Sequence, residues 1–194
     1  MTNRPVSVPR RGLNDKQAAT VERLYAEAMK LLKEVGHEDL AMRAVGQRAG
    51  VSPATVYTYF SSKDHLFVEL FWRVIEQDGA IELTAPTPMS RLQELVGHLA
   101  DVVAGVPELT AAVHKSLLAG DPEVQRVRAD IGTWCVGQFH EAVGSNASLP
   151  PQMVRTLTFA LTGALLQAGM GVFGYDELGD HLVDTVAVIM REVA

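Results

Sequence analysis

The segment of residues 42–66 constrains the fold of this 194-residue chain more than any other part of the sequence. Gly50 stands where the chain must turn, because a residue without a side chain adopts a left-handed conformation at little cost. Ser52 and Pro53 follow in the order of a helix N-cap and a first helical residue, so a second helix begins there. The pattern predicts a helix-turn-helix. Three apolar residues at helical spacing define one face of its first helix: Met42, Val45 and Ala49.

The second helix of this motif combines an apolar anchor with a polar outer face. Val56 and Phe60 have the spacing of the anchor, and hydroxyl-bearing residues lie between and around them. Hydroxyls and an ammonium group within about two turns of a capped helix start can reach phosphate oxygens and base edges of DNA. Two short helices that serve only a small helical core would share the same spacing. The residue types favour DNA: Tyr57, Thr58, Tyr59 and Lys63.

The motif resembles the DNA-binding domain of TetR-family transcriptional regulators. The resemblance rests on Ala49-Gly50-Val51-Ser52, Thr55-x-Tyr57-x-Tyr59-Phe60 and Ser62-Lys63-x-x-Leu66. It covers about residues 14–72, and the remainder resembles the family only in length and helical pattern. Two positions depart from the family: Ala41 replaces a usual capping Thr and Gly46 a usual Ala, so the first helix of the motif is expected to be less stable.

The resemblance implies roles for individual residues. Thr55, Tyr57 and Thr58 are expected near base edges, while Tyr59 and Lys63 are expected on phosphates. The full set of residues expected at the DNA is Thr20, Arg43, Ser52, Pro53, Ala54, Thr55, Tyr57, Thr58, Tyr59 and Lys63. The resemblance also implies a homodimeric, ligand-responsive repressor that binds double-stranded DNA at an inverted-repeat operator.

The distribution of charge agrees with a DNA-binding N-terminal part. The formal net charge is −6, yet residues 1–75 hold 11 Lys and Arg against 8 Asp and Glu, while residues 76–194 hold 6 against 15. This asymmetry is typical of a nucleic-acid-binding domain joined to a domain with another task. With a hydrophobic content of 47% the chain is expected to be globular.

The single cysteine, Cys135, excludes a disulfide within the chain and a cysteine-rich metal site, which favours a reducing compartment. The first eleven residues are basic and lack the apolar run of a secretory signal. A cytoplasmic protein without metal or cofactor is therefore expected.

Helical periodicity continues along the chain and no stretch alternates long enough to form a strand, so the fold is predicted to be all-α. Three N-terminal helices, the first starting with the capping-box pair Asn14 and Gln17, precede a helical ligand-binding and dimerisation domain. The expected division is a flexible basic arm at 1–13, a helix-turn-helix domain at 14–61, and a ligand-binding and dimerisation domain at 62–194.

Residues 156–175 contain no charged side chain, which is long enough for a membrane span. Threonines and glycines interrupt the run, and no basic loop follows it. A helix buried against a second subunit explains the missing charges better, because the family forms a four-helix bundle from its last two helices. The residues expected at this interface are Ala160, Ala164, Gln167, Ala168, Leu182, Val186 and Ile189.

The spacing G-x-G-x-x-G occurs at Gly169, Gly171 and Gly174, which suggests a nucleotide-binding enzyme. A dinucleotide site needs a preceding strand, whereas helical residues lead into these glycines, so close packing and a helix C-cap are the better interpretation. Other catalytic patterns are lacking, and scattered histidines are commonly satisfied polar residues. The chain is therefore not expected to be an enzyme.

The apolar residues between the two ends of the chain form either a plain core or a cavity for a small, mostly apolar effector. The residues expected to line such a cavity are Leu99, Val103, Val113, His114, Leu117, Trp134, Gln138, Phe159 and Phe173. Two rivals to a ligand-responsive repressor stay open at this stage: a helical carrier or enzyme whose N-terminal helices are only structural, and a membrane-tethered protein.

Overall fold

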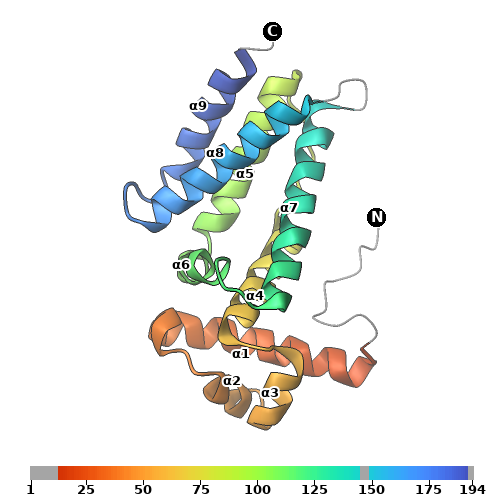
Figure 1. Ribbon diagram of the computed structural model, residues 1–194, viewed down its shortest axis with the longest axis vertical. Helices are drawn as coiled ribbons and strands as arrows, with labels where there is room; N and C mark the ends of the chain where they lie inside the picture. Colours follow the sequence, from red (N-terminus) through yellow and green to blue (C-terminus); the bar gives the residue numbers. More distant parts are fainter. Residues whose placement is uncertain (1–12, 145–148, 192–194) are drawn as a thin grey trace. The chain divides into compact units, whose positions relative to one another are not determined.

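The computed structural model describes residues 13–144 and 149–191 (Figure 1). The described residues form helices joined by turns and loops, with no strand among them, which confirms the all-α prediction. Residues 1–12, and with them almost all of the predicted basic arm, lie outside the described residues. The helices are α1 (Asp15–Asp39), α2 (Met42–Arg48), α3 (Pro53–Tyr59), α4 (Lys63–Asp78), α5 (Pro88–Ala104), α6 (Pro107–Ser116), α7 (Pro122–Val143), α8 (Pro151–Gly169) and α9 (Leu178–Arg191).

The chain divides into two compact units. The first comprises Met1–Glu76 and Glu108–Arg128, and the second Gln77–Pro107 and Ala129–Ala194. The first unit therefore holds α1–α3, nearly all of α4 and α6, and the first turns of α7. Packing thus joins two further segments to the helix-turn-helix, beyond the expected domain boundary at residue 61.

Helix α1 begins at a capping box, as its sequence predicts. The Asn14 side chain accepts a hydrogen bond from the Gln17 amide, and the Gln17 side chain accepts one from the Asn14 amide, both at 3.0 Å. These bonds satisfy two amides that a helix start otherwise leaves unpaired. The helix is interrupted at Gly36, whose φ of 75° is left-handed, and continues for one short turn to Asp39.

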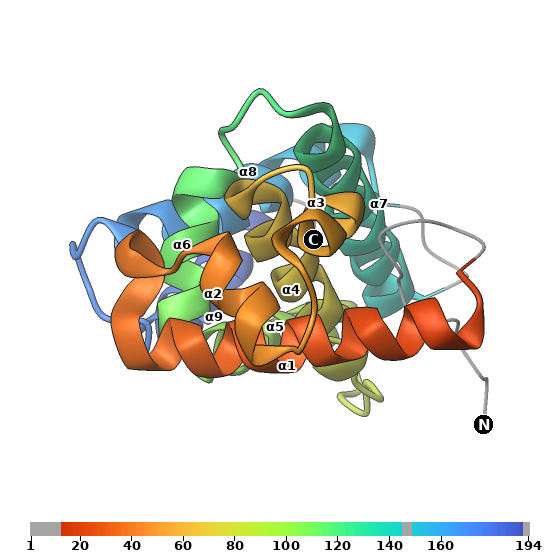
Figure 2. The same ribbon diagram turned by 90° about the horizontal axis from the view of Figure 1, so that it is seen from below.

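The corner between α2 and α3 has the conformation that the sequence predicts (Figure 2). Gly50 has a φ of 70°, and the amide of Val51 donates to the carbonyl of Gly46 at 2.9 Å, which closes α2. The Ser52 hydroxyl accepts from the Thr55 amide at 3.2 Å and caps α3. Ala41, by contrast, forms no side-chain cap on α2.

Side chains of α1 to α4 form much of the apolar core of the first unit. The most buried include Val21, Leu24, Ala28 and Leu32 of α1, Val45 of α2, Val56 of α3, and Leu66, Val68 and Leu70 of α4, together with Phe60 between α3 and α4.

In the second unit, α9 packs along α5, and α8 packs on α9 (Figure 1). The apolar faces of α5 and α9 supply Leu92, Leu95, Leu99, Val103, Leu178, Leu182 and Val186 to its core. The Arg91 guanidinium donates to the carbonyls of Ala142 and Val143 at 2.6 and 3.1 Å, so it ties α5 to the last turn of α7.

The glycines after α8 form a helix cap. The amide of Val172 donates to the carbonyl of Gln167, that of Gly171 donates to Ala168, and Gly171 has a φ of 75°. This is the hydrogen-bond pattern of a Schellman motif, as the sequence predicts for these residues. In the described chain no single helix has the length and hydropathy to cross a membrane, and α5 and α6 meet those criteria only when taken together across the break between them.

The packing of α2 against α3 explains why Gly46 stands where the family usually has alanine. A Cβ atom at Gly46 would lie 2.6 Å from Cγ2 of Val56 and 3.3 Å from the carbonyl oxygen of Val51. The glycine therefore lets α2 approach α3 closely, at a cost in helix propensity of roughly 1 kcal/mol relative to alanine.

We expect Gly46→Ala to destabilise the protein although alanine favours helices. Overpacking costs about 1–3 kcal/mol, which outweighs the gain in propensity. Urea unfolding of the single variants and of Gly46→Ala combined with Val56→Ala measures the coupling between the two sites. The double variant should lose less than the sum of the single variants. Strictly additive losses would show that the close approach to Val56 is not the cause.

Candidate nucleic-acid interface

Helix α3 presents a nearly continuous exposed surface over a buried anchor. Val56 is fully buried and Phe60, the residue that ends the helix, is fully buried as well. The Tyr57 side chain is 54% exposed, although an aromatic residue of this size usually buries more of its surface. The other exposed residues of this surface are Ser52, Pro53, Ala54 and Thr58, with Thr55 half-buried among them.

The hydroxyls of this surface are partly used within the helix. The Thr58 hydroxyl donates to the Ala54 carbonyl at 3.0 Å, and the Thr55 and Ser52 hydroxyls lie 2.9 Å apart. The proton of Thr58 is thus committed, while its oxygen lone pairs and its methyl group stay available. Thr58 can therefore accept a hydrogen bond from outside the helix, or contact an apolar group there.

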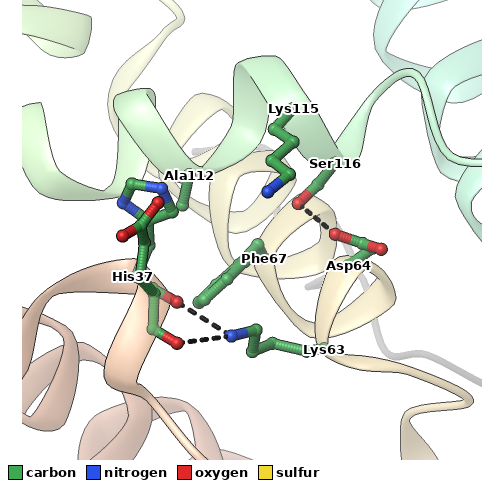
Figure 3. Close-up of a pocket in the computed structure, with 8 residues that line it drawn as sticks. His37, Lys63, Asp64, Phe67, Ala112, Lys115 and Ser116 are labelled. Atoms are coloured by element: carbon green, nitrogen blue, oxygen red, sulfur yellow. Dashed lines mark hydrogen bonds between the residues drawn. The ribbon is translucent and has the colours of Figure 1, made fainter.

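Two predicted phosphate contacts need correction. Tyr59 is only 8% exposed, so most of its side chain packs inside the first unit. The Lys63 ammonium donates to the carbonyls of His37 and Glu38, both at 3.0 Å (Figure 3). A cation at these carbonyls stabilises the end of α1, because the last carbonyls of a helix carry partial negative charge. Tyr59 thus ends α3 as a buried residue, and Lys63 at the start of α4 is directed to the end of α1.

Thr20 and Arg43 differ in how free their side chains are. The Thr20 hydroxyl donates to the Lys16 carbonyl at 2.9 Å and accepts from Arg23 at 3.3 Å. Arg43 is exposed in the first turn of α2.

Arg23 also donates from Nε to the Ala49 carbonyl at 3.4 Å, so it links α1 to the turn of the motif. Sequence analysis missed Arg23, because its partner lies 26 residues away and no local pattern signals the bond.

A buried ion-pair network joins α4 to α7 within the first unit. Glu69 is 1% exposed, and its Oε1 accepts from the Arg126 guanidinium at 2.7 Å and lies 3.2 Å from Nε2 of His65. Nδ1 of His65 accepts the Ser61 amide at 3.1 Å, which assigns the ring proton to Nε2 and directs it at the carboxylate. The i, i+4 spacing of His65 and Glu69 was the available sequence signal.

Asp121 connects the same segment to the residues that follow α3. Its Oδ2 accepts from the hydroxyls of Ser61 at 2.7 Å and Ser62 at 2.8 Å, and its Oδ1 accepts from the Glu123 amide at 2.9 Å. Burial opposes ionisation of this carboxyl, yet the hydrogen bonds from Ser61, Ser62 and Glu123 hold its pKa below its usual value. Sequence analysis does not identify this contact, because Ser61 and Asp121 lie 60 residues apart in the chain.

Comparison with known proteins agrees with this geometry. Residues 24–70 match the sequence model of the bacterial regulatory proteins, tetR family. An HTH-type transcriptional regulator of Mycobacterium tuberculosis is 41% identical over 180 residues, which covers 91% of this chain and 83% of that protein. The chain belongs to the TetR family of transcriptional regulators. It is thus a DNA-binding regulator and not an enzyme.

One further relative and two solved structures are informative for this TetR-family regulator. The HTH-type transcriptional repressor KstR of Mycolicibacterium smegmatis is 32% identical over 112 residues, 56% of this chain and 55% of that repressor. The crystal structure of a TetR transcriptional regulator from Rhodococcus sp. RHA1 superposes with a TM-score of 0.77 at 19% identity, covering 93% of this chain and all of that one. The multidrug binding protein EbrR, solved with imidazole, superposes with a TM-score of 0.58 at 21% identity over 94% of this chain and 97% of that one.

Several residues predicted at a TetR-type dimer interface instead pack inside the second unit. Leu182 and Val186 are each 2% exposed on the face of α9 that meets the core, and Ala168 is buried too. Ala160, Ala164 and Ile189 are half-buried, and Gln167 is exposed. The stripe of alanines is therefore turned partly inward rather than fully outward. The outward face of α8 lies one position away, at Phe159, Thr162, Gly163, Leu166 and Met170.

The residues predicted to line an effector cavity are divided between the two units. Val113, His114 and Leu117 belong to the first unit and the other six to the second. Leu99, Val103, Val113 and Gln138 are buried, while His114, Leu117, Trp134 and Phe173 are half-buried. Phe159 needs correction, because it is 69% exposed on the outer face of α8 and so does not line an interior cavity of this chain.

Asp121 gives a test of the contacts between the start of α7 and the end of the DNA-binding motif. We expect Asp121→Asn to reduce the free energy of unfolding at pH 7 by about 1 kcal/mol, since it weakens charge-assisted hydrogen bonds. Because the pKa of Asp121 is lower in the folded than in the unfolded protein, its stabilisation is complete above the unfolded value and disappears as pH falls through the folded value. Urea unfolding at several pH values should therefore show the variant and the wild type converging below about pH 4.

Asp184→Asn serves as the matched control, because Asp184 is exposed on α9. It should change stability little at any pH. A loss in Asp121→Asn that stays constant down to pH 3 would contradict a role for the ionised carboxylate.

Proposed function

We propose that this TetR-family regulator is a homodimeric repressor that leaves an inverted-repeat operator when a small, mostly apolar effector binds. The single observation that carries the DNA-binding part is the exposed surface of α3 over its buried anchor, with Tyr57 at its centre. The repressor assignment is supported by the similarity to KstR, which is named a transcriptional repressor.

The chemistry of α3 favours readout of base edges by a few short side chains. Thr58 offers an acceptor oxygen and a methyl group, which suit the amino group of adenine or cytosine and the methyl group of thymine. Ala54 and Pro53 are small or compact, so the start of the helix can approach the groove. Tyr57 offers a ring and a hydroxyl that can contact a base edge or phosphate.

Phosphate contacts are assigned mainly to Arg43, with Lys63 acting indirectly. Arg43 is exposed at the start of α2, whereas the Lys63 ammonium is held by two carbonyls at the end of α1. An amine engaged inside the protein releases fewer counterions from DNA than a free one. Lys63 would then serve DNA binding by fixing α4 against α1.

The proposed dimer uses the outward face of α8. Phe159 and Leu166 of α8 are 69% and 47% exposed, and Met170, which caps the helix end, is 62% exposed. The helix carries almost no charge. An apolar surface of this kind commonly marks a protein interface. Gly163 lies between Phe159 and Leu166 and has open space beside it, so a helix of a second subunit could approach closely there.

The effector proposal rests on the residues of the second unit and on a structural neighbour. Leu99, Val103 and Trp134 supply apolar surface, and Gln138 supplies a polar group that could orient a ligand. EbrR, which has a similar fold, is described as a multidrug binding protein and was crystallised with imidazole. A mostly apolar effector is consistent with the few charges among these residues.

Binding of the full chain to the DNA upstream of its own gene tests the proposed function. In fluorescence anisotropy we expect saturable binding that weakens steeply with salt, and footprinting should reveal an inverted repeat with half-sites about one helical turn apart or a multiple of it. Unchanged anisotropy at micromolar protein and low salt would reject that target.

On such an operator, Thr58→Ala and Arg43→Gln should have different effects. Thr58→Ala should change the preference at one base pair per half-site by about 1–3 kcal/mol. Arg43→Gln should weaken binding about equally on all sequences and lower the salt slope by roughly one unit. Thr133→Ala is the matched control for Thr58→Ala, because the Thr133 hydroxyl makes the same bond to a carbonyl four residues earlier.

Lys63→Gln should lower the salt slope by clearly less than Arg43→Gln. An equal decrease would show that the Lys63 ammonium contacts phosphate directly.

For the dimer, Phe159→Glu should separate the subunits in sedimentation, because it would bury an unpaired charge. Phe159 is exposed in the single chain, so the variant should keep its helical content. Leu118→Glu is the matched control, because Leu118 is 82% exposed outside α8. Dissociation by both variants, or by neither, would contradict the assignment to α8.

A further inference from the structure

A small cleft lies within the first unit, and none of its lining residues is among those predicted to line an effector cavity. It has a volume of about 300 Å³ and lies between the end of α1, the start of α4 and the end of α6 (Figure 3). This volume is at the lower limit of small-molecule sites, which run from roughly 300 to 1,000 Å³.

The wall and rim of the cleft differ in chemistry. Phe67 and Ala112 form an apolar wall, and both are almost completely buried. Lys115 reaches over this wall from α6, and the His37 ring faces it from the other side (Figure 3). A ligand that fits must therefore combine an apolar body with a group that an ammonium and an imidazole can bind.

Most polar side chains around the cleft already have partners. The Ser116 hydroxyl donates to Asp64 at 2.7 Å, and the Lys63 ammonium donates to two carbonyls, which leaves one of its three N–H groups free to donate. Within the described part of the chain, Lys115 Nζ and the His37 ring make no hydrogen bond or ion pair, although both face the cleft (Figure 3). The donors left for a ligand are thus the ammonium groups of Lys115 and Lys63 and the ring N–H of His37.

These donors favour a carboxylate over a metal ion or a cation. The described part of the chain holds no group of three or more His, Cys, Asp or Glu that could bind a metal. Asp64 is engaged by Ser116, whereas no side chain of the described residues donates to the carboxylate of Glu38, the other acidic residue that lines the cleft. We propose that the cleft binds a small organic acid, with its carboxylate at Lys115 and His37 and its apolar body on Phe67.

The position of the cleft would give such a ligand an effect on the DNA-binding motif. Gly36 interrupts α1 immediately before His37, and α2 begins at Met42. A ligand held by His37 and Lys115 would tie the last turn of α1 to α6, and would thereby restrain the connection into the helix-turn-helix. This site is distinct from the proposed effector cavity, and its occupancy can be measured without DNA.

The test uses the full chain and benzoate as the probe, with benzyl alcohol as its uncharged counterpart. Isothermal titration should give saturable binding of benzoate with a Kd on the order of 1 mM, and benzyl alcohol should bind at least about tenfold more weakly. Equal affinity for the two probes, or no saturation by benzoate at about ten times that Kd, would overturn the proposal.

Variants at the rim should change the affinity in opposite directions. Lys115→Gln should weaken benzoate binding roughly fivefold, and Glu38→Gln should strengthen it roughly twofold, because one removes an attractive and the other a repulsive charge. Lys30→Gln is the control, since Lys30 is an exposed lysine of α1 that does not line the cleft. Benzoate binding unchanged in Lys115→Gln, or weakened by Glu38→Gln, would reject the assigned carboxylate position.

A second measurement locates the probe independently of these variants. The ring-proton signals of His37, identified in NMR spectra by their loss in His37→Gln, should shift with the same Kd that titration gives. Unshifted His37 signals at saturating benzoate would place the probe elsewhere and overturn the proposal.

Discussion

The buried carboxylate of Glu69 imposes a constraint on which much of the first unit depends. A charge almost completely removed from water is tolerated only when ion pairs and hydrogen bonds compensate it. Arg126 of α7 and His65 of α4 provide that compensation at Oε1. Because Arg126 lies 57 residues further along the chain, compensation of this charge requires the start of α7 to pack with α4.

Further polar contacts add to that constraint. Ser116 donates to Asp64, and Asp121 accepts from both serines that separate α3 from α4. The segment of residues 108–128 is thus held to the end of the DNA-binding motif by hydrogen bonds as well as by apolar packing. Any change in the position of this segment must break or rearrange these bonds, which gives a physical route by which it could influence α3.

The exposed surface of α3 depends on a turn, a helix cap and a close helix contact that tolerate little change in sequence. Gly50 supplies the left-handed turn, Ser52 caps α3, and Gly46 lets α2 approach Val56. Each of these features acts through the backbone or through one close contact. Together they hold Tyr57 and Thr58 outward on a short helix that would be marginal by itself in water.

The sequence by itself determined the all-α class, the helix-turn-helix with its caps, the capping box at Asn14 and the helix cap at Gly171, because each depends on residues within about six positions of one another. It also determined the family, through a long and specific local motif. The tertiary structure alone decided that Lys63 turns to the end of α1, that Tyr59 is buried, and that Leu182 and Val186 face the core while Phe159 faces outward. Helical periodicity defines neighbouring faces of a helix but not which of them meets a partner, since that choice depends on contacts between residues far apart in the chain.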